Sequence, residues 1–178
     1  PVPSSAASDV YKRQDCDYDE MLQTTVRSSF ANQGQICLCG SRIFVEASMY
    51  QKFKTDFIAA VSKLKVGNPF DTNTDIGALV SRSHLEKVKT YIDNAAQYGG
   101  KVIFGGATVS VDNSEDGYYL EPTIIEVQDN SCILNQEEIF GPVVTIMPFN
   151  DENEVLAMAN DVSYGLSATL WTNLSLIH

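Results

Sequence analysis

Apolar positions along the chain follow two spacings, one typical of helices and one typical of strands. Spacings of three and four residues predict helices that begin near Asp17, Ser48, Ser83 and Asp151. Short apolar or β-branched runs predict strands. These are RIFVE (Arg42 to Glu46), KVIFGG from Lys101, the stretch Tyr118 to Val127 with its internal proline, the run Val143 to Phe149, and Leu166 to Trp171. Strands that alternate with such helices predict an α/β fold, with a largely parallel sheet and crossover helices.

The predicted helices also have recognisable ends. Serine is favoured at the residue that precedes a helix, so Ser48 and Ser83 are predicted N-caps. Glycine favours helix termination. We therefore expect the first helix to end before Gly34, the second at Gly67 and the third at Gly99.

The two ends of the chain differ from its middle. Residues 1–14 have no apolar periodicity and resemble a translated cDNA-library adaptor, and residues 175–178 look foreign for the same reason. We therefore interpret residues 1–14 and 175–178 as non-native tails and leave them outside the predicted fold. Residues 15–174 are then the native part, cut from a longer protein.

Composition and charge exclude several classes of protein. The chain has 12 Lys+Arg against 23 Asp+Glu and a formal net charge of −11, which argues against nucleic-acid or anionic membrane partners. No apolar run approaches the roughly 20 residues that cross a bilayer, and no signal-peptide layout is present. Four cysteines in 178 residues are too few for a disulfide framework, so reduced thiols are expected. We expect a cytoplasmic protein.

The first candidate for chemistry is FANQGQICLCGSR, which spans Phe30 to Arg42. A helix is predicted to end there, and Gly34 permits a sharp turn before Cys37. A cysteine in such a loop can face a cleft, with its thiolate favoured by backbone N–H groups. The alternative is that Cys37, between apolar neighbours, is a small core residue, as Cys39 would also be.

Metal binding and Cys–His chemistry are weaker alternatives. Cys37 and Cys39 would need further ligands, yet the chain has only His84 and His178, and their spacing matches no zinc signature. We therefore expect no metal site. A Cys–His hydrolase would require His84 within hydrogen-bond reach of Cys37. We interpret His84 instead as a solvated side chain on an amphipathic helix.

The second candidate is QEEIFGPVV, which spans Gln136 to Val144. Two adjacent acids precede an aromatic residue, a Gly-Pro turn and an apolar strand. This order predicts that Glu138 and Phe140 lie at the edge of a sheet, where open α/β folds bind cofactors. A carboxylate there can accept both hydroxyls of a ribose, and a phenyl ring can pack on a flat ring. The alternative is a solvated pair of acids and a core phenylalanine.

GQIC, followed about a hundred residues later by EEIFGPV, resembles the NAD(P)-dependent aldehyde dehydrogenase superfamily. The segments VGNPFDTNTDIGALVS, GYYLEPTII and NDVSYGLSATLWT are similar to the family in order and spacing. The resemblance runs from about Asp15 to Asn173. Within the family, LQTTVRSSFANQGQICLCGSRIFVE is most similar to the 2-aminomuconic and 2-hydroxymuconic semialdehyde dehydrogenase branch. The resemblance implies that residues 15–174 are part of the aldehyde dehydrogenase catalytic domain.

The resemblance implies roles for residues at matching positions. Cys37, fourth in GQIC, matches the catalytic thiol. Glu138, the second acid of EEIFGPV, matches the residue that holds the nicotinamide ribose, and Phe140 matches the aromatic residue beside it. The positions implied to support the active site are Asn32, Gly34, Gln35, Asn160 and Gly165.

The resemblance also implies a reaction. The parent enzyme is expected to oxidise a small-molecule aldehyde, of the muconic semialdehyde type, to a carboxylic acid through a cysteine thiohemiacetal and thioester. The implied cofactor is NAD, with NADP as the alternative, and the parent is expected to be a homo-oligomer. The family's general base and most of its cofactor site lie upstream of the matched region, so we expect the chain alone to be inactive. The alternatives are a non-catalytic structural fragment and a different cysteine-dependent hydrolase.

Overall fold

The computed structural model describes residues 16–112, 114 and 117–172, together with the backbone of residues 8–12. These residues form a six-stranded sheet in the order β3-β6-β7-β2-β1-β8 and a two-stranded sheet of β4 and β5. The elements in chain order are β1 (Ser8–Lys12), α1 (Tyr18–Phe30), the 3₁₀ turn η1 (Ala31–Gly34), β2 (Gly40–Glu46), α2 (Tyr50–Val61), α3 (Arg82–Asp93), β3 (Gly100–Phe104), β4 (Thr108–Val109), β5 (Tyr119–Leu120), β6 (Thr123–Val127), α4 (Ile133–Gln136), β7 (Val143–Phe149), α5 (Glu152–Asn160) and β8 (Ser167–Trp171).

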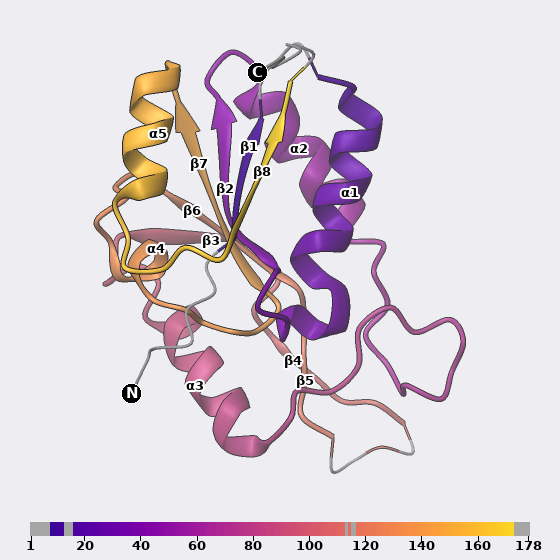
Figure 1. Cartoon of the computed structure of the whole chain (residues 1–178). Helices are drawn as coiled ribbons and strands as arrows, with labels where there is room; N and C mark the ends of the chain where they lie inside the picture. Colours follow the sequence, from indigo (N-terminus) through magenta and orange to yellow (C-terminus); the bar gives the residue numbers. More distant parts are fainter. Residues whose placement is uncertain (1–7, 13–15, 113, 115–116, 173–178) are drawn as a thin grey trace.

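The large sheet is mostly parallel, as the sequence predicts. The pairs β1–β2, β1–β8, β2–β7 and β6–β7 are parallel, and only β3 runs antiparallel, to β6. In the β2–β7 pair, Arg42 lies opposite Thr145 and Glu46 lies opposite Phe149. Because parallel neighbours begin at the same end of a sheet, the loops that lead into β2 and β7 meet there (Figure 1).

Helices bury both faces of the central strands. In Figure 1, α1 and α2 lie together on one side of the sheet and α5 lies on the other. Successive residues of β2 alternate between two hydrophobic clusters, since Ile43 and Val45 pack with Phe53 and Phe57 of α2, whereas Phe44 packs with residues of α3 and α5. Continuous apolar runs are expected for parallel strands that are covered on both faces.

Two helices begin where the sequence predicts. The carboxylate of Asp17 accepts a hydrogen bond from the backbone N–H of Glu20 at the start of α1. Asp151 does the same for Glu154 at the start of α5. Both are N-caps three residues before the donor, which is the expected geometry. Among the described residues, no helix is long and apolar enough to cross a membrane.

Two predicted N-caps are wrong. α3 is capped by Ser81 rather than Ser83, because Ser81 has an extended backbone and its hydroxyl accepts from the N–H of His84 at 3.2 Å. Ser83 already lies inside the first turn. α2 begins at Tyr50 without a side-chain cap, since the hydroxyl of Ser48 donates to a carboxylate two residues earlier.

Strand β1 lies in a segment that the sequence pattern leaves outside the fold. The backbone of Ser8–Lys12 pairs in parallel with both β2 and β8. Such pairing uses backbone N–H and C=O groups, which every sequence supplies, so apolar periodicity does not reveal it. The predicted boundaries after residues 14 and 174 lie outside the described residues. The foreign origin of the two tails therefore stays a prediction.

The predicted stretch from Tyr118 to Val127 divides into two strands. Pro122 separates β5, which pairs with β4, from β6, which joins the large sheet. Proline cannot donate a backbone hydrogen bond, so it interrupts the ladder at that point. β4 and α4 have only 2 and 4 residues, too few for a periodic pattern to show.

Candidate active site

Cys37 lies at the tip of a tight turn between α1 and β2. The N–H of Cys39 donates to the carbonyl oxygen of Ile36 at 3.0 Å, which closes a turn with Cys37 and Leu38 at its centre. Cys37 is exposed, whereas Cys39 is only 8% exposed. The interpretation as a small core residue is therefore wrong for Cys37 and confirmed for Cys39.

The second thiol of the GQICLC segment is in a less reactive setting. The Sγ atom of Cys39 lies 3.8 Å from the carbonyl oxygen of Ala31. Burial raises the pKa of the Cys39 thiol, although a backbone contact with Ile36 acts in the opposite direction. Since the thiolate is the nucleophilic form, a raised pKa disfavours Cys39 as a nucleophile at neutral pH.

The chain reaches Cys37 through three consecutive residues with positive φ angles. These are Asn32 at 49°, Gln33 at 59° and Gly34 at 68°. The left-handed region costs glycine nothing and asparagine little. The N–H of Gln35 donates to the carbonyl oxygen of Asn32 at 3.0 Å, and the Asn32 side chain donates back to the carbonyl oxygen of Gln35 at 3.2 Å. The structure thus places Asn32, Gly34 and Gln35 in the reversal that leads to the thiol.

Glu138 and Phe140 lie in the loop between α4 and β7. Ile139, between them, is 7% exposed and belongs to the core, whereas Glu138 and Phe140 are half-buried. A small cavity of about 20 Å³ has residues of both loops in its lining, among them Ile36, Cys39, Glu138 and Phe140. The structure therefore brings the predicted cofactor residues against the thiol loop.

The two loops are also in direct backbone contact. Gly34 lies so close to the backbone of Gly141 that no side chain would fit at residue 34. Glu138 and Phe140 were expected at the edge of a sheet where open α/β folds bind cofactors. Their loop leads into β7, an interior strand, and it meets the thiol loop at the amino ends of β7 and β2. The reason is that parallel neighbours start at the same end.

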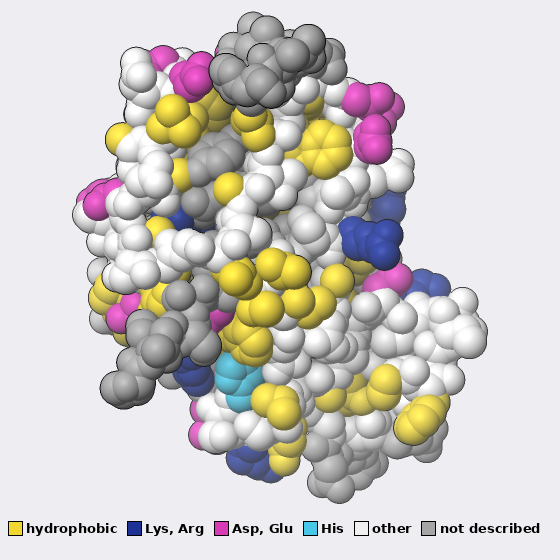
Figure 2. All heavy atoms as spheres, viewed as in Figure 1, with side chains coloured by type: hydrophobic (Ala, Val, Ile, Leu, Met, Phe, Trp, Pro, Cys, Tyr) yellow, Lys and Arg dark blue, Asp and Glu magenta, His cyan; other side chains and the backbone are white. Residues whose placement is uncertain are grey.

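The surface around the thiol is apolar. Ile36 is 37% exposed and Leu38 is 57% exposed, although both side chains are hydrophobic. Figure 2 shows hydrophobic side chains gathered in the middle of the face viewed, over the loops that lead into the sheet. In the part of the chain that the structure describes, no group of three or more His, Cys, Asp or Glu residues could hold a metal ion.

His84 is less solvated than the sequence predicts. It is half-buried, and its Nε2 atom lies 2.7 Å from the carbonyl oxygen of Phe140. The two rings meet edge to face, with 6.3 Å between their centroids. Within the described ranges no hydrogen bond joins His84 to Cys37. The helical spacing of His84, Val88 and Tyr91 was the signal that could have placed His84 on an inward face.

Asn160 and Gly165 do not join these contacts. The side chain of Asn160 donates to the carbonyl oxygen of Leu156 in its own helix at 2.7 Å. Gly165 has open space where a Cβ atom would lie. Among the hydrogen bonds of the described residues, none links either of them to the thiol loop. Their supporting role stays a prediction.

Comparisons with known proteins cover nearly the whole chain. The model of the aldehyde dehydrogenase family matches residues 6–177. The chain is 46% identical over 170 residues to 2-aminomuconic semialdehyde dehydrogenase from Bos taurus. The aligned region covers 93% of this chain and 35% of that protein. It is 40% identical over 166 residues to 2-aminomuconic 6-semialdehyde dehydrogenase from a Pseudomonas species, which covers 92% and 34%. The chain thus spans about a third of the length of these relatives.

Solved structures give the same assignment. The fold is similar to betaine aldehyde dehydrogenase from Staphylococcus aureus in complex with NAD+, with a TM-score of 0.89 and 35% identity over 95% of this chain and 33% of that one. A point mutant of that enzyme was crystallised with NAD+ and a BME-modified cysteine. Sequence, family model and fold agree on one conclusion: the chain belongs to the aldehyde dehydrogenase family.

Proposed function

We propose that the chain supplies the nucleophilic thiol and one side of the nicotinamide site of an enzyme that oxidises an aldehyde to a carboxylic acid with NAD. One observation carries the proposal. The exposed Cys37 lies on a turn that packs directly against the loop of Glu138 and Phe140. A covalent oxidation needs a nucleophile and a hydride acceptor in adjacent positions.

The loop before β7 fits a nicotinamide ribose. The half-buried Glu138 presents a carboxylate, which accepts hydrogen bonds only and suits two neighbouring hydroxyl groups. Phe140 presents a flat apolar ring next to it. NAD, when bound, supplies the acceptor for the hydride. The NAD+ in the structurally similar betaine aldehyde dehydrogenase supports this choice of cofactor.

Cys37 forms the covalent bond to the substrate in this mechanism. Its thiolate adds to the carbonyl carbon of the aldehyde, a C–S bond forms, and the π electron pair moves to oxygen to give a thiohemiacetal anion. We assign the backbone N–H of Cys37 as a donor to that oxygen. When the oxygen lone pair reforms the C=O bond, the hydride leaves the carbon and a thioester remains on Cys37.

Release of the acid requires a second group. A water molecule must lose a proton as it attacks the thioester carbon, and the C–S bond then breaks to restore the thiol. The family resemblance places the residue that takes this proton upstream of the matched region. On that ground we propose that the 178-residue chain cannot complete this step by itself.

The substrate that we propose is a muconic-type semialdehyde. The support comes from the names of relatives that are 40–46% identical to this chain. The exposed apolar side chains of Ile36 and Leu38, on either side of the thiol, suit the carbon chain of such a molecule. We also propose a homo-oligomeric enzyme, as the family resemblance implies, and a cytoplasmic one, as expected from the sequence.

The proposal is tested in an intact enzyme that carries this sequence. Cys37→Ala should abolish NADH formation with a semialdehyde substrate, because no thiol then remains at the turn. Cys39→Ala is the matched control and should keep most of the activity. Full activity of Cys37→Ala, or equal loss in both variants, would overturn the proposal and favour a non-catalytic role or another cysteine chemistry.

A further inference from the structure

Helix α3 presents one face to the loop that carries Glu138. Tyr91 donates from its hydroxyl to the carboxylate of Glu137 at 2.5 Å, and the ammonium group of Lys87 donates to the carbonyl oxygen of Glu138 at 3.2 Å. His84 contacts the carbonyl oxygen of Phe140 at 2.7 Å. Side chains three, four and seven residues apart share one face of a helix, so these contacts form a continuous row.

The contact of His84 has a defined polarity. A carbonyl oxygen can only accept a hydrogen bond, so the Nε2 atom of His84 carries a proton and donates it. The acceptor, Phe140, has a φ angle of 60°, which is unfavourable for a residue with a Cβ atom. Such a conformation persists only where surrounding contacts hold it. The bond from His84 is one of these contacts, and it acts within two residues of Glu138.

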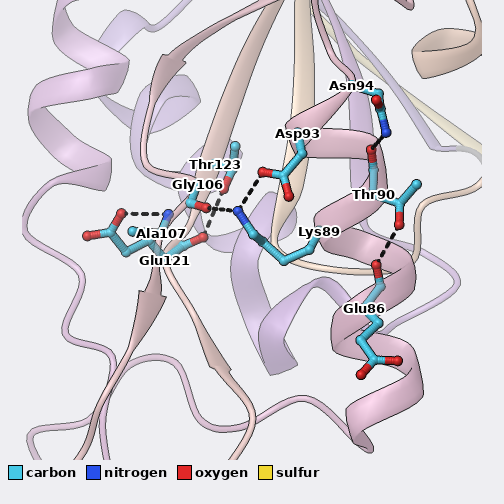
Figure 3. A network of polar contacts seen from close by, with 9 residues as sticks. All are labelled: Glu86, Lys89, Thr90, Asp93, Asn94, Gly106, Ala107, Glu121 and Thr123. Atoms are coloured by element: carbon cyan, nitrogen blue, oxygen red, sulfur yellow. Dashed lines mark hydrogen bonds and ion pairs between the residues drawn. The ribbon is translucent and has the colours of Figure 1, made fainter.

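Helix α3 is itself fixed on another side. Figure 3 shows the polar contacts that link it to the turn after β3. The ammonium group of Lys89 contacts Asp93 at 2.6 Å and the carbonyl oxygen of Gly106 at 3.2 Å. The next residue of that turn, Ala107, donates its N–H to the carboxylate of Glu121 at 3.1 Å. Contacts on one side therefore hold helix α3 in place, while a different side of the helix contacts the loop of Glu138.

The residues just before α3 contact the thiol loop. The N–H of Val80 donates to the side-chain oxygen of Gln35 at 3.1 Å. With its amide in the orientation that satisfies both groups, Gln33 accepts from the N–H of Gly77 at 2.7 Å. Residues 77–84 therefore contact both the loop of Cys37 and the loop of Glu138.

We propose that His84 is a positioning residue, which holds the backbone at Phe140 so that Glu138 meets the nicotinamide ribose in a productive orientation. The inference rests on the cofactor role proposed for Glu138. His84 touches neither thiol nor substrate in this role. Its effect is transmitted through the Phe140 carbonyl oxygen, while residues 77–80 hold the other loop in place.

The first test measures the loop directly in the 178-residue chain and does not depend on activity. Amide hydrogen exchange of residues 137–141 should be about tenfold faster in His84→Ala than in the wild-type chain, because a fixing contact is lost. His84→Gln should restore slow exchange, since the glutamine amide nitrogen can donate in place of Nε2. Glu86→Ala, an exposed change on the same helix, is the control and should leave exchange unaltered.

The second test uses an intact enzyme that carries this sequence. At saturating NAD, His84→Ala should slow single-turnover hydride transfer by about tenfold to a hundredfold, because small misplacements of reacting groups have effects of that size. The dissociation constant for NAD should change by less than about threefold. His84→Gln should recover most of the rate, and Glu86→Ala should match the wild type.

The outcomes separate the two claims. Amide exchange that is unchanged in His84→Ala would overturn the positioning role. So would a rate of hydride transfer in His84→Gln that is as low as in His84→Ala. A two-bond ¹H–¹⁵N spectrum of the wild-type chain that shows Nδ1 rather than Nε2 protonated would do the same without any variant. If amide exchange is faster in His84→Ala but the intact wild-type enzyme forms no NADH, the contact between His84 and the loop stands. The proposed function is then refuted instead.

Discussion

The carbonyl oxygen of Gly141 occupies the space that a Cβ atom on residue 34 would need. This approach ties the thiol loop to the cofactor loop, and it involves backbone on both sides. Gly34 also has a φ angle of 68°, in the region where only glycine is free of strain. Both facts demand glycine at this position.

A methyl group at residue 34 should therefore separate the two loops. We expect Gly34→Ala to lower the free energy of unfolding by about 2–4 kcal/mol, through steric overlap and an unfavourable φ angle. Gly165→Ala is the matched control, because its Cβ position is open, and it should stay within about 0.5 kcal/mol. Urea unfolding of the chain measures both. Equal stability of the two variants would contradict the described contact.

The two cysteines of the turn should differ in reactivity. In the folded chain, iodoacetamide should modify Cys37 at least about tenfold faster than Cys39, because Cys37 is exposed while burial raises the pKa of Cys39. Peptide mass mapping after a short exposure gives the two rates. Unfolding in urea should make the rates similar. A faster reaction at Cys39 in the folded chain would refute the assignment of the nucleophile.

A third prediction concerns the cofactor side. In an intact enzyme that carries this sequence, Glu138→Gln should slow hydride transfer more than it weakens dinucleotide binding, because the ribose contact orients the nicotinamide. We expect a loss of about tenfold or more in the single-turnover rate. The neighbouring Glu137→Gln, whose carboxylate contacts Tyr91, provides a comparison. A large loss of NAD affinity with an unchanged transfer rate would show that Glu138 only binds.

The chain by itself should not turn over aldehydes. Purified 178-residue protein, mixed with NAD and a simple aldehyde, should form no steady NADH, because the family resemblance places the general base upstream of the matched region. Iodoacetamide should still label Cys37 in the same sample, since the thiol is exposed. Steady NADH production would mean that the chain contains a complete site.

Away from the site, a half-buried carboxylate links β6 to α2. Glu126 accepts from Lys54 at 2.7 Å and from the hydroxyl of Tyr50 at 2.8 Å. Burial raises the pKa of Glu126, but the bonds from Lys54 and Tyr50 outweigh it and leave the pKa below its ordinary value. A lowered pKa in the folded state stabilises the fold above the unfolded pKa of about 4.3. That contribution disappears as the pH falls through the folded pKa.

We therefore expect Lys54→Met to destabilise the chain by about 1 kcal/mol at pH 7. The difference from the wild type should shrink as the pH falls through the lowered pKa of Glu126 in the folded wild type, because below it the carboxyl group is protonated in both proteins. Lys63→Met, at an exposed position on the turn after α2, is the control and should have little effect. Urea unfolding across this pH range provides the measurement. A stability difference that grows at low pH would contradict a lowered pKa of Glu126 in the folded chain.

Much of the sheet could be predicted because its strands carry continuous apolar runs. Val143 to Phe149 and Arg42 to Glu46 are strands as expected, and they pair in parallel. Strand β1 could not be predicted, since its pairing depends on backbone groups rather than on side-chain pattern. The N-cap of α3 was misplaced for a local reason, because two serines compete and only Ser81 lies three residues before a free N–H.

GQIC and EEIFGPV assign roles to Cys37 and Glu138 by resemblance, and these roles stay predictions. The topology explains why the two loops meet. Local pattern alone could not separate Cys37 from Cys39, because exposure depends on a turn that one hydrogen bond closes. The contact of His84 with Phe140 depends on how α3 packs, which no motif records.

The parallel pairing of β2 with β7 also has a consequence for how the protein folds. The two strands are separated by about a hundred residues, so their pairing is a non-local event and is expected to be slow. During synthesis the thiol loop emerges well before the loop of Glu138. We expect the loop of Cys37 to have no contact with the loop of Glu138 until β7 inserts next to β2. The contact between the thiol loop and the loop of Glu138 then forms together with that insertion.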